Sequence, residues 1–200
     1  MELTAVFESW HIGDGNYPPL HRGQLVQLSF ELQPKGLLVI SDSASSELQH
    51  RGDAEYSGRG VVLRRYKGGG ETIAVLEAGG LRFYVHGSKA EKLAQGSWVQ
   101  FEGTLFLDHY LWVEYVHEYA DPPDLFYNLR VTRLRKVAIP NRFVHRHARG
   151  MSFPTHVRPA DWDAVEELET MEDQSFEEEF YVLDFDGRGL EAAKISRTFQ

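Results

Sequence analysis

The chain has 200 residues, of which 42% are hydrophobic and 26% charged, so it can bury a core and does not have the composition of a disordered protein. It has no cysteine, which excludes disulfides, thiolate metal sites and cysteine nucleophiles. Its formal net charge of -9 disfavours nonspecific binding to nucleic acid, although a local basic surface could still bind it.

The N-terminal residues contain neither a basic segment nor a long apolar run, so they do not predict a signal peptide. No stretch approaches the roughly 18 apolar residues that a membrane helix needs. We therefore expect a cytoplasmic protein that does not associate with membranes.

The N-terminal part of the chain predicts strands separated by turns. Residues 3–10, 24–32 and 37–40 favour strands because apolar residues alternate or run together in them. A turn rich in glycine and proline separates the first two strands, and the small polar side chains of residues 41–53 predict a loop.

The clearest strand pattern follows, between residues 59 and 119. It predicts three short strands, at residues 61–66, 72–77 and 81–86. A helix of at most two turns follows, which begins with an S-x-x-E capping box at residues 88–91 and ends at Gly96. Two longer strands come next, at residues 98–107 and 110–119. This element order is that of the OB-fold, a partly open five-stranded barrel. We predict a mainly β fold with a small, OB-like antiparallel barrel that the N-terminal strands extend, and a β-barrel domain over residues 1–120.

The remaining residues, 124–200, predict a C-terminal α+β segment. Residues 125–139 favour a long strand whose alternation places Val131 and Arg133 on one face. Residues 161–171 favour an amphipathic helix because apolar residues recur at three-residue spacing, and residues 180–185 favour a last strand.

Two blocks of opposite charge lie next to each other in this segment. Residues 125–160, the basic tract, contain eight Lys and Arg and no Asp or Glu, whereas residues 161–186, the acidic tract, contain twelve Asp and Glu and no Lys or Arg. Because each tract acts as a high local concentration of counter-charge for the other, we expect them to lie together when nothing else is bound. Exposed ion pairs contribute only about 0–1 kcal/mol each, so a stronger partner could open this contact.

The tracts point to binding rather than catalysis, with two alternatives for the partner. A protein partner would be engaged by the acidic tract, in particular by Glu177, Glu178 and Glu179. Single-stranded nucleic acid would be engaged by arginines that bind phosphate, with nearby aromatic rings stacking on bases; the candidate residues are Arg130, Arg133, Arg135, Lys136, Arg142 and Arg146. We prefer the protein partner because the total charge is negative.

A metal-dependent enzyme is the third alternative. His145 and His147 would point to the same side of an extended chain and could share a zinc ion with His156, whereas the neighbouring arginines oppose a dication. The chain contains no P-loop, G-x-S-x-G or H-E-x-x-H motif, so no cofactor other than this zinc ion is predicted.

Overall fold

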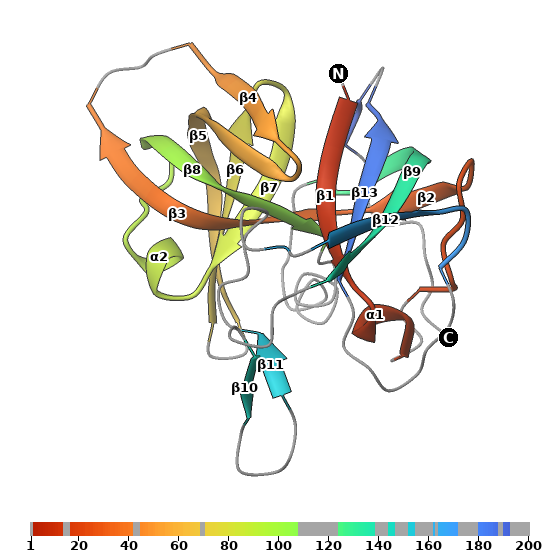
Figure 1. The fold of residues 1–200 in the computed structure, drawn as a ribbon. Helices are drawn as coiled ribbons and strands as arrows, with labels where there is room; N and C mark the ends of the chain where they lie inside the picture. The colour runs from red at the N-terminus through yellow and green to blue at the C-terminus, as the bar shows by residue number, and fades with distance from the viewer. Residues whose placement is uncertain are drawn as a thin grey trace.

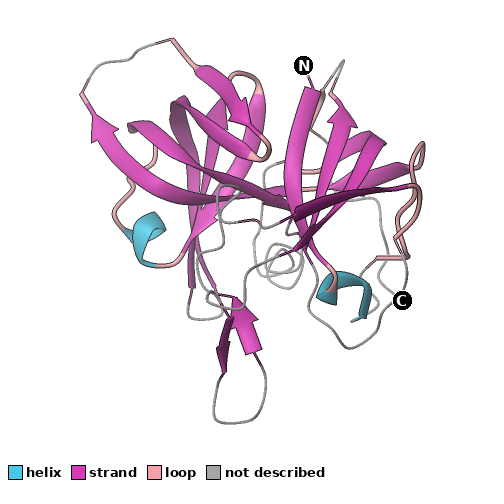
Figure 2. Cartoon of the chain, in the orientation of Figure 1, coloured by secondary structure: helices cyan, strands magenta, loops and turns pink. Residues whose placement is uncertain are grey.

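The protein is mainly β in the computed structural model, which describes residues 2–13, 17–41, 45–68, 71–107, 124–138, 144–146, 152–154, 162, 164–171, 180–187 and 190–192. The strands form one large sheet and a separate two-stranded sheet (Figures 1 and 2). Across the described ranges, no helix is long and apolar enough to cross a membrane.

Five strands of the large sheet close into a barrel: β3 (Phe30–Ile40), β5 (Glu55–Gly68), β6 (Glu71–Ala78), β7 (Leu81–His86) and β8 (Trp98–Leu107). The strands β5, β6 and β7 form an antiparallel meander, and β7 pairs in parallel with β3. Because β8 pairs with both β3 and β5, the ring is complete. A short helix, α2 (Ser88–Glu91), connects β7 to β8. The prediction of a small β barrel is therefore confirmed.

Glycines allow the close turns and approaches that this barrel needs. Gly79 and Gly80 connect β6 to β7 with φ values of 57° and 83°, which glycine adopts without strain. A Cβ added to Gly58 in β5 would lie 2.2 Å from the carbonyl oxygen of Glu47. The close packing of β5 against the neighbouring strand therefore depends on the absence of a side chain at residue 58.

Two parts of the barrel differ from the prediction. The predicted strand at residues 110–119 lies outside the described residues, and the fifth strand of the barrel is β3, from the N-terminal part of the chain. Residues 41–53 are not all loop, because β4 (Glu47–Gly52) pairs with β5. The sequence pattern did not indicate β4 because most of its side chains are polar. Its one large apolar residue, Leu48, packs against the core. The OB-like identity of the barrel stays a prediction.

A second ring of strand pairings lies beside the barrel and shares β3 and β8 with it, as Figure 1 shows. Its other strands are β1 (Glu2–Glu8), β2 (Leu25–Leu28), β9 (Tyr127–Ala138) and β13 (Phe180–Asp186). β1 pairs with β8 and β13, β13 pairs with β9, and β9 pairs with β2. The ring is completed because β2 continues into β3 through Ser29. A short helix, α1 (Trp10–Gly13), follows β1, and β10 (Val144–Arg146) and β11 (Ser152–Pro154) form the two-stranded sheet.

The predicted helix at residues 161–171 is wrong. Residues Ala164–Leu168 form a strand, β12, that pairs with the C-terminal half of β9. Val165 is 45% exposed, whereas Met171 is buried, so the three-residue spacing does not mark one apolar helix face. Pairing with β12 gives hydrogen-bond partners to the backbone groups of β9 beyond the end of β2, which explains why this segment is extended.

The barrel and the second ring of strands share a continuous core. The phenyl group of Phe30 in β3 packs edge-on against Phe185 in β13, with 6.4 Å between their centroids. It also packs in a tilted orientation against Tyr127 in β9, at 5.9 Å. The predicted division into residues 1–120 and 124–200 stays a prediction, and strands from both sides of it pair with each other.

Candidate functional site

A bulge in the pairing of β9 with β13 determines which basic side chains reach the surface. Arg133 lies opposite Asp184 and Val131 opposite Phe185, so Thr132 is an extra residue in β9. The bulge changes the alternation, and Leu134 rather than Arg133 is buried. The prediction that Val131 and Arg133 share a face is therefore wrong, and Arg133 is exposed.

Arg133 forms an exposed ion pair with the acidic tract. Its Nε and Nη2 atoms donate to Oε2 of Glu167 in β12, at 2.9 and 2.7 Å. These hydrogen bonds lower the pKa of Glu167 and raise the pKa of Arg133. Because both side chains are about half exposed, solvent screens the pair and it adds little to stability.

Arg135, by contrast, belongs to a largely buried polar network. Its Nη2 donates to Oδ1 of Asp184 at 2.9 Å and its Nη1 donates to Oδ1 of Asp53 at 3.1 Å. The Arg135 and Asp184 side chains are only 12% and 8% exposed. The same Asp184 oxygen accepts from Oγ1 of Thr4 at 2.8 Å.

Tyr56 connects this network to the barrel. The backbone N–H of Thr4 donates to the Tyr56 hydroxyl at 2.8 Å. Burial raises the pKa of Tyr56 to about 12, so its hydroxyl stays protonated. The network therefore joins β9, β13 and β1 to β5 and to the β4–β5 turn, where Asp53 has a φ of 45°.

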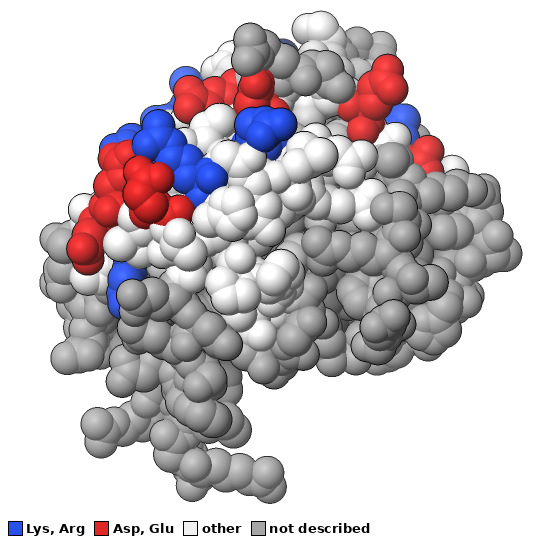
Figure 3. All heavy atoms as spheres, turned by 90° about the vertical axis from the view of Figure 1, so that its right-hand side faces the viewer, with Lys and Arg blue, Asp and Glu red and all other residues white. Residues whose placement is uncertain are grey.

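The expectation that the two tracts lie together is confirmed for the residues that the structure describes. Glu167 and Asp184 of the acidic tract bind Arg133 and Arg135 of the basic tract. A third arginine, Arg130, donates from Nη1 to the carbonyl oxygen of Gly23 at 2.6 Å. Among the described residues on the face in Figure 3, Lys and Arg lie beside Asp and Glu.

The other predicted site residues fall partly outside the described residues. Lys136 lies in β9, opposite Glu166 of β12. The backbone of His145 and Arg146 lies in β10, and their side chains are not described. The predicted residues that lie outside the described ranges are Arg142, His147, His156, Glu177, Glu178 and Glu179.

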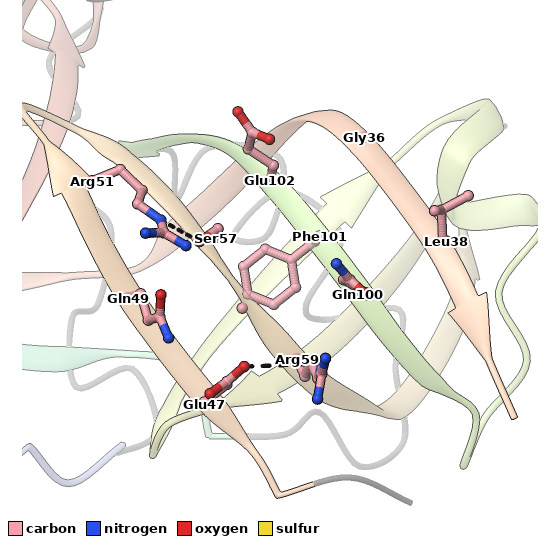
Figure 4. Close-up of a pocket in the computed structure, with 11 residues that line it drawn as sticks. Gly36, Leu38, Glu47, Gln49, Arg51, Ser57, Arg59, Gln100, Phe101 and Glu102 are labelled. Atoms are coloured by element: carbon pink, nitrogen blue, oxygen red, sulfur yellow. Dashed lines mark hydrogen bonds and ion pairs between the residues drawn. The ribbon is translucent and has the colours of Figure 1, made fainter. Parts of the chain in front are cut away.

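The outer face of the barrel has a hollow of about 410 Å³ that the sequence did not predict (Figure 4). It lies over β3, β8, β5 and β4, where Gly36, Glu102, Ser57 and Gln49 form one row across the four strands. The face is hollow because Gly36 has no side chain and that of Ser57 is short.

Charged and amide side chains surround this hollow. Nε of Arg51 donates to Oγ of Ser57 at 2.7 Å, and Nε of Arg59 lies 3.9 Å from Oε1 of Glu47. Gln49 and Gln100 line it as well, on opposite sides of Phe101 in Figure 4.

A second hollow, of about 640 Å³, lies between β3, β8 and the segment that leads from β7 into α2. Oε1 of the buried Glu31 is 3.0 Å from Nε2 of His86, and Nδ1 of His86 is buried. In addition, Lys35 pairs with Glu55, and Oγ1 of Thr104 donates to Glu55 at 3.2 Å. One imidazole nitrogen of His86 therefore contacts the Glu31 carboxylate, and the other is shielded from solvent.

No group of three or more His, Cys, Asp or Glu side chains that could hold a metal ion occurs in the described part of the chain. No protein-family model matches the chain, and comparisons with curated proteins and with solved structures found no match. The function is therefore argued from the geometry of this structure.

Proposed function

We propose that this protein is a non-catalytic binding protein that engages a protein partner through its acidic tract. The proposal rests on the internal contacts of β9. Arg130, Arg133 and Arg135 already donate to acceptors within the protein, so these cations are not available to a polyanion without loss of those contacts. Releasing Arg135 would also leave the buried carboxylate of Asp184 without its counter-charge, which is unfavourable.

The acidic tract contains the surplus of charge. Its twelve carboxylates exceed the eight cations of the basic tract by four, even if every cation of the basic tract is paired. Glu167 and Asp184 are used internally, and Glu169 pairs with Arg22 at 3.2 Å. A surplus of one sign favours and accelerates association with a surface of the opposite sign. We therefore expect a partner protein with a basic surface.

Affinity purification from the native host tests this proposal with two variants of equal charge change. Glu177→Gln, Glu178→Gln and Glu179→Gln are combined in one variant. The control combines Glu2→Gln, Glu91→Gln and Glu191→Gln, all at exposed positions outside the acidic tract. A protein recovered by the wild type and the control, but lost with the first variant, would support the proposal. Recovery of the same proteins by all three would contradict it.

Binding of single-stranded nucleic acid by an OB-like barrel is the alternative. A closed five-stranded barrel with the partly exposed Trp98 on its outer face supports it. This alternative predicts that labelled oligonucleotides are retained at low salt and released steeply as salt rises. No retention at low salt, even after deletion of residues 161–186, would exclude it.

A further inference from the structure

We infer that the hollow on the outer barrel face binds an extended polypeptide segment of a protein partner. None of the described residues of the acidic tract lines this hollow, so the inference goes beyond the proposed function and can fail independently of it. The hollow is bordered by residues from four strands (Figure 4).

The hydrogen-bonding groups around the hollow match those of a peptide backbone. Gln49 projects from β4 and Gln100 from β8, and the two amides line opposite sides of the hollow. A primary amide has both donors and an acceptor, which is also what a peptide group offers. Two such amides on opposite sides of the hollow can therefore bind the two backbone edges of an extended segment lying between them.

The charges around the hollow are balanced, which favours a polypeptide over a polyanion. Arg51 and Arg59 are matched by Glu47 and Glu102, and both signs occur on the wall. Within the described residues, Glu102 makes no ion pair, whereas Arg59 is held only loosely, 3.9 Å from Glu47. A phosphate backbone would be repelled by the two carboxylates, whereas a segment with side chains of both signs would complement all four groups.

An apolar surface continues from one side of the hollow. Leu38 on the wall is 67% exposed. The next row across the sheet is apolar and partly exposed, formed by Ile40, Trp98 and Val61. An apolar side chain of the bound segment would bury Leu38 and part of this row.

Gly36 allows a direct test because the hollow can be filled without disturbing the fold. A Cβ at this position would meet no atom within 4 Å, and the backbone of Gly36 does not require a positive φ. We therefore expect Gly36→Phe to fold with an unchanged melting temperature and to occupy the hollow. Gln33→Phe, at an exposed position of the same strand next to the other hollow, is the matched control.

The probe is a phage-displayed library of random dodecapeptides, selected on the full-length wild-type protein. We expect enriched peptides that bind Gly36→Phe at least about tenfold more weakly than the wild type, and that bind Gln33→Phe as well as the wild type. If Gly36→Phe fails to fold, the double variant Gln49→Ala and Gln100→Ala, which truncates two exposed side chains, is expected to show the same loss.

Three results would overturn the inference. The first is a selection that yields no enriched peptide. The second is enriched peptides that bind the hollow variants as tightly as the wild type. The third is a single-stranded oligonucleotide that binds the wild type and loses its affinity on Gly36→Phe. The last result would show that the hollow takes nucleic acid and not a polypeptide.

Discussion

Acidification is expected to destabilise this protein through His11, which lies in α1 and is 1% exposed. Burial lowers its pKa from 6.5 to about 4, and a hydrogen bond with the backbone of Leu107 opposes this shift. The ring stacks on Trp10, with 3.8 Å between the centroids, and lies 5.4 Å from the ring of Phe7. A protonated imidazole would be poorly solvated in this cluster.

The direction and size of the effect follow from the two pKa values. Above about pH 7 the imidazole is neutral in both the folded and the unfolded state, so it adds no pH dependence. As the pH falls from 6.5 towards 4, the unfolded chain binds a proton that the folded protein excludes, and stability is lost. With 1.36 kcal/mol for each pKa unit, the loss is about 2 kcal/mol at pH 5 and about 3 kcal/mol below pH 4.

Urea denaturation of the wild type and of His11→Phe at pH 8 and pH 5 measures this loss. Phenylalanine keeps an aromatic ring against Trp10 and Phe7 but does not titrate. All other titratable groups are common to both proteins, so the wild type should lose about 2 kcal/mol more than the variant between the two pH values. Equal losses, or an NMR titration of His11 with a midpoint near 6.5, would refute the reasoning.

Three further outcomes follow from contacts described above. Arg135→Ala should lower the free energy of unfolding by about 3–5 kcal/mol because it leaves a buried carboxylate unpaired, whereas Arg133→Ala should change it little; similar effects in urea denaturation would contradict this contrast. Gly58→Ala should cost about 1–3 kcal/mol because its Cβ would clash with the carbonyl oxygen of Glu47, and Gly36→Ala should be tolerated. Equal melting temperatures of these two variants would show that β4 can shift. The predicted histidine zinc site requires stoichiometric zinc by elemental analysis and a higher melting temperature on addition of zinc, and the absence of both would exclude it.

Much of the barrel could be predicted because alternate burial leaves a local pattern. Residues 81–86 form β7 as predicted, and residues 98–107 form β8. Two adjacent glycines between strand patterns favour a tight hairpin, and Gly79 and Gly80 form such a turn between β6 and β7. In these segments the local pattern is sufficient to predict the element.

Elements defined by long-range pairing were not predictable in the same way. β4 is polar along most of its length, and its pairing with β5 identifies it as a strand. β12 has apolar spacing compatible with a helix, and the available edge of β9 makes it a strand. The bulge at Thr132 likewise depends on the partner strand, because only the register with β13 shows that β9 has an extra residue.

The two candidate binding surfaces also differ in whether the local sequence could predict them. The charge tracts were evident because their residues are consecutive in the sequence, and the ion pairs of Arg133 and Arg135 connect neighbouring strands. The barrel hollow was not evident because its wall comes from four strands and its depth depends on a missing side chain at Gly36. No short sequence motif indicates such an arrangement.

The pairing of β1 with β13 affects how the protein forms during synthesis. Glu2 lies opposite Asp186, so the entire barrel is translated between these two partner strands. While the ribosome is still producing β9, strand β1 with its apolar residues Leu3 and Phe7 lacks β13, the strand that pairs with one of its edges. An uncovered apolar edge is prone to mispairing with other chains. The nascent polypeptide must therefore keep its first strand from aggregating until β13 emerges.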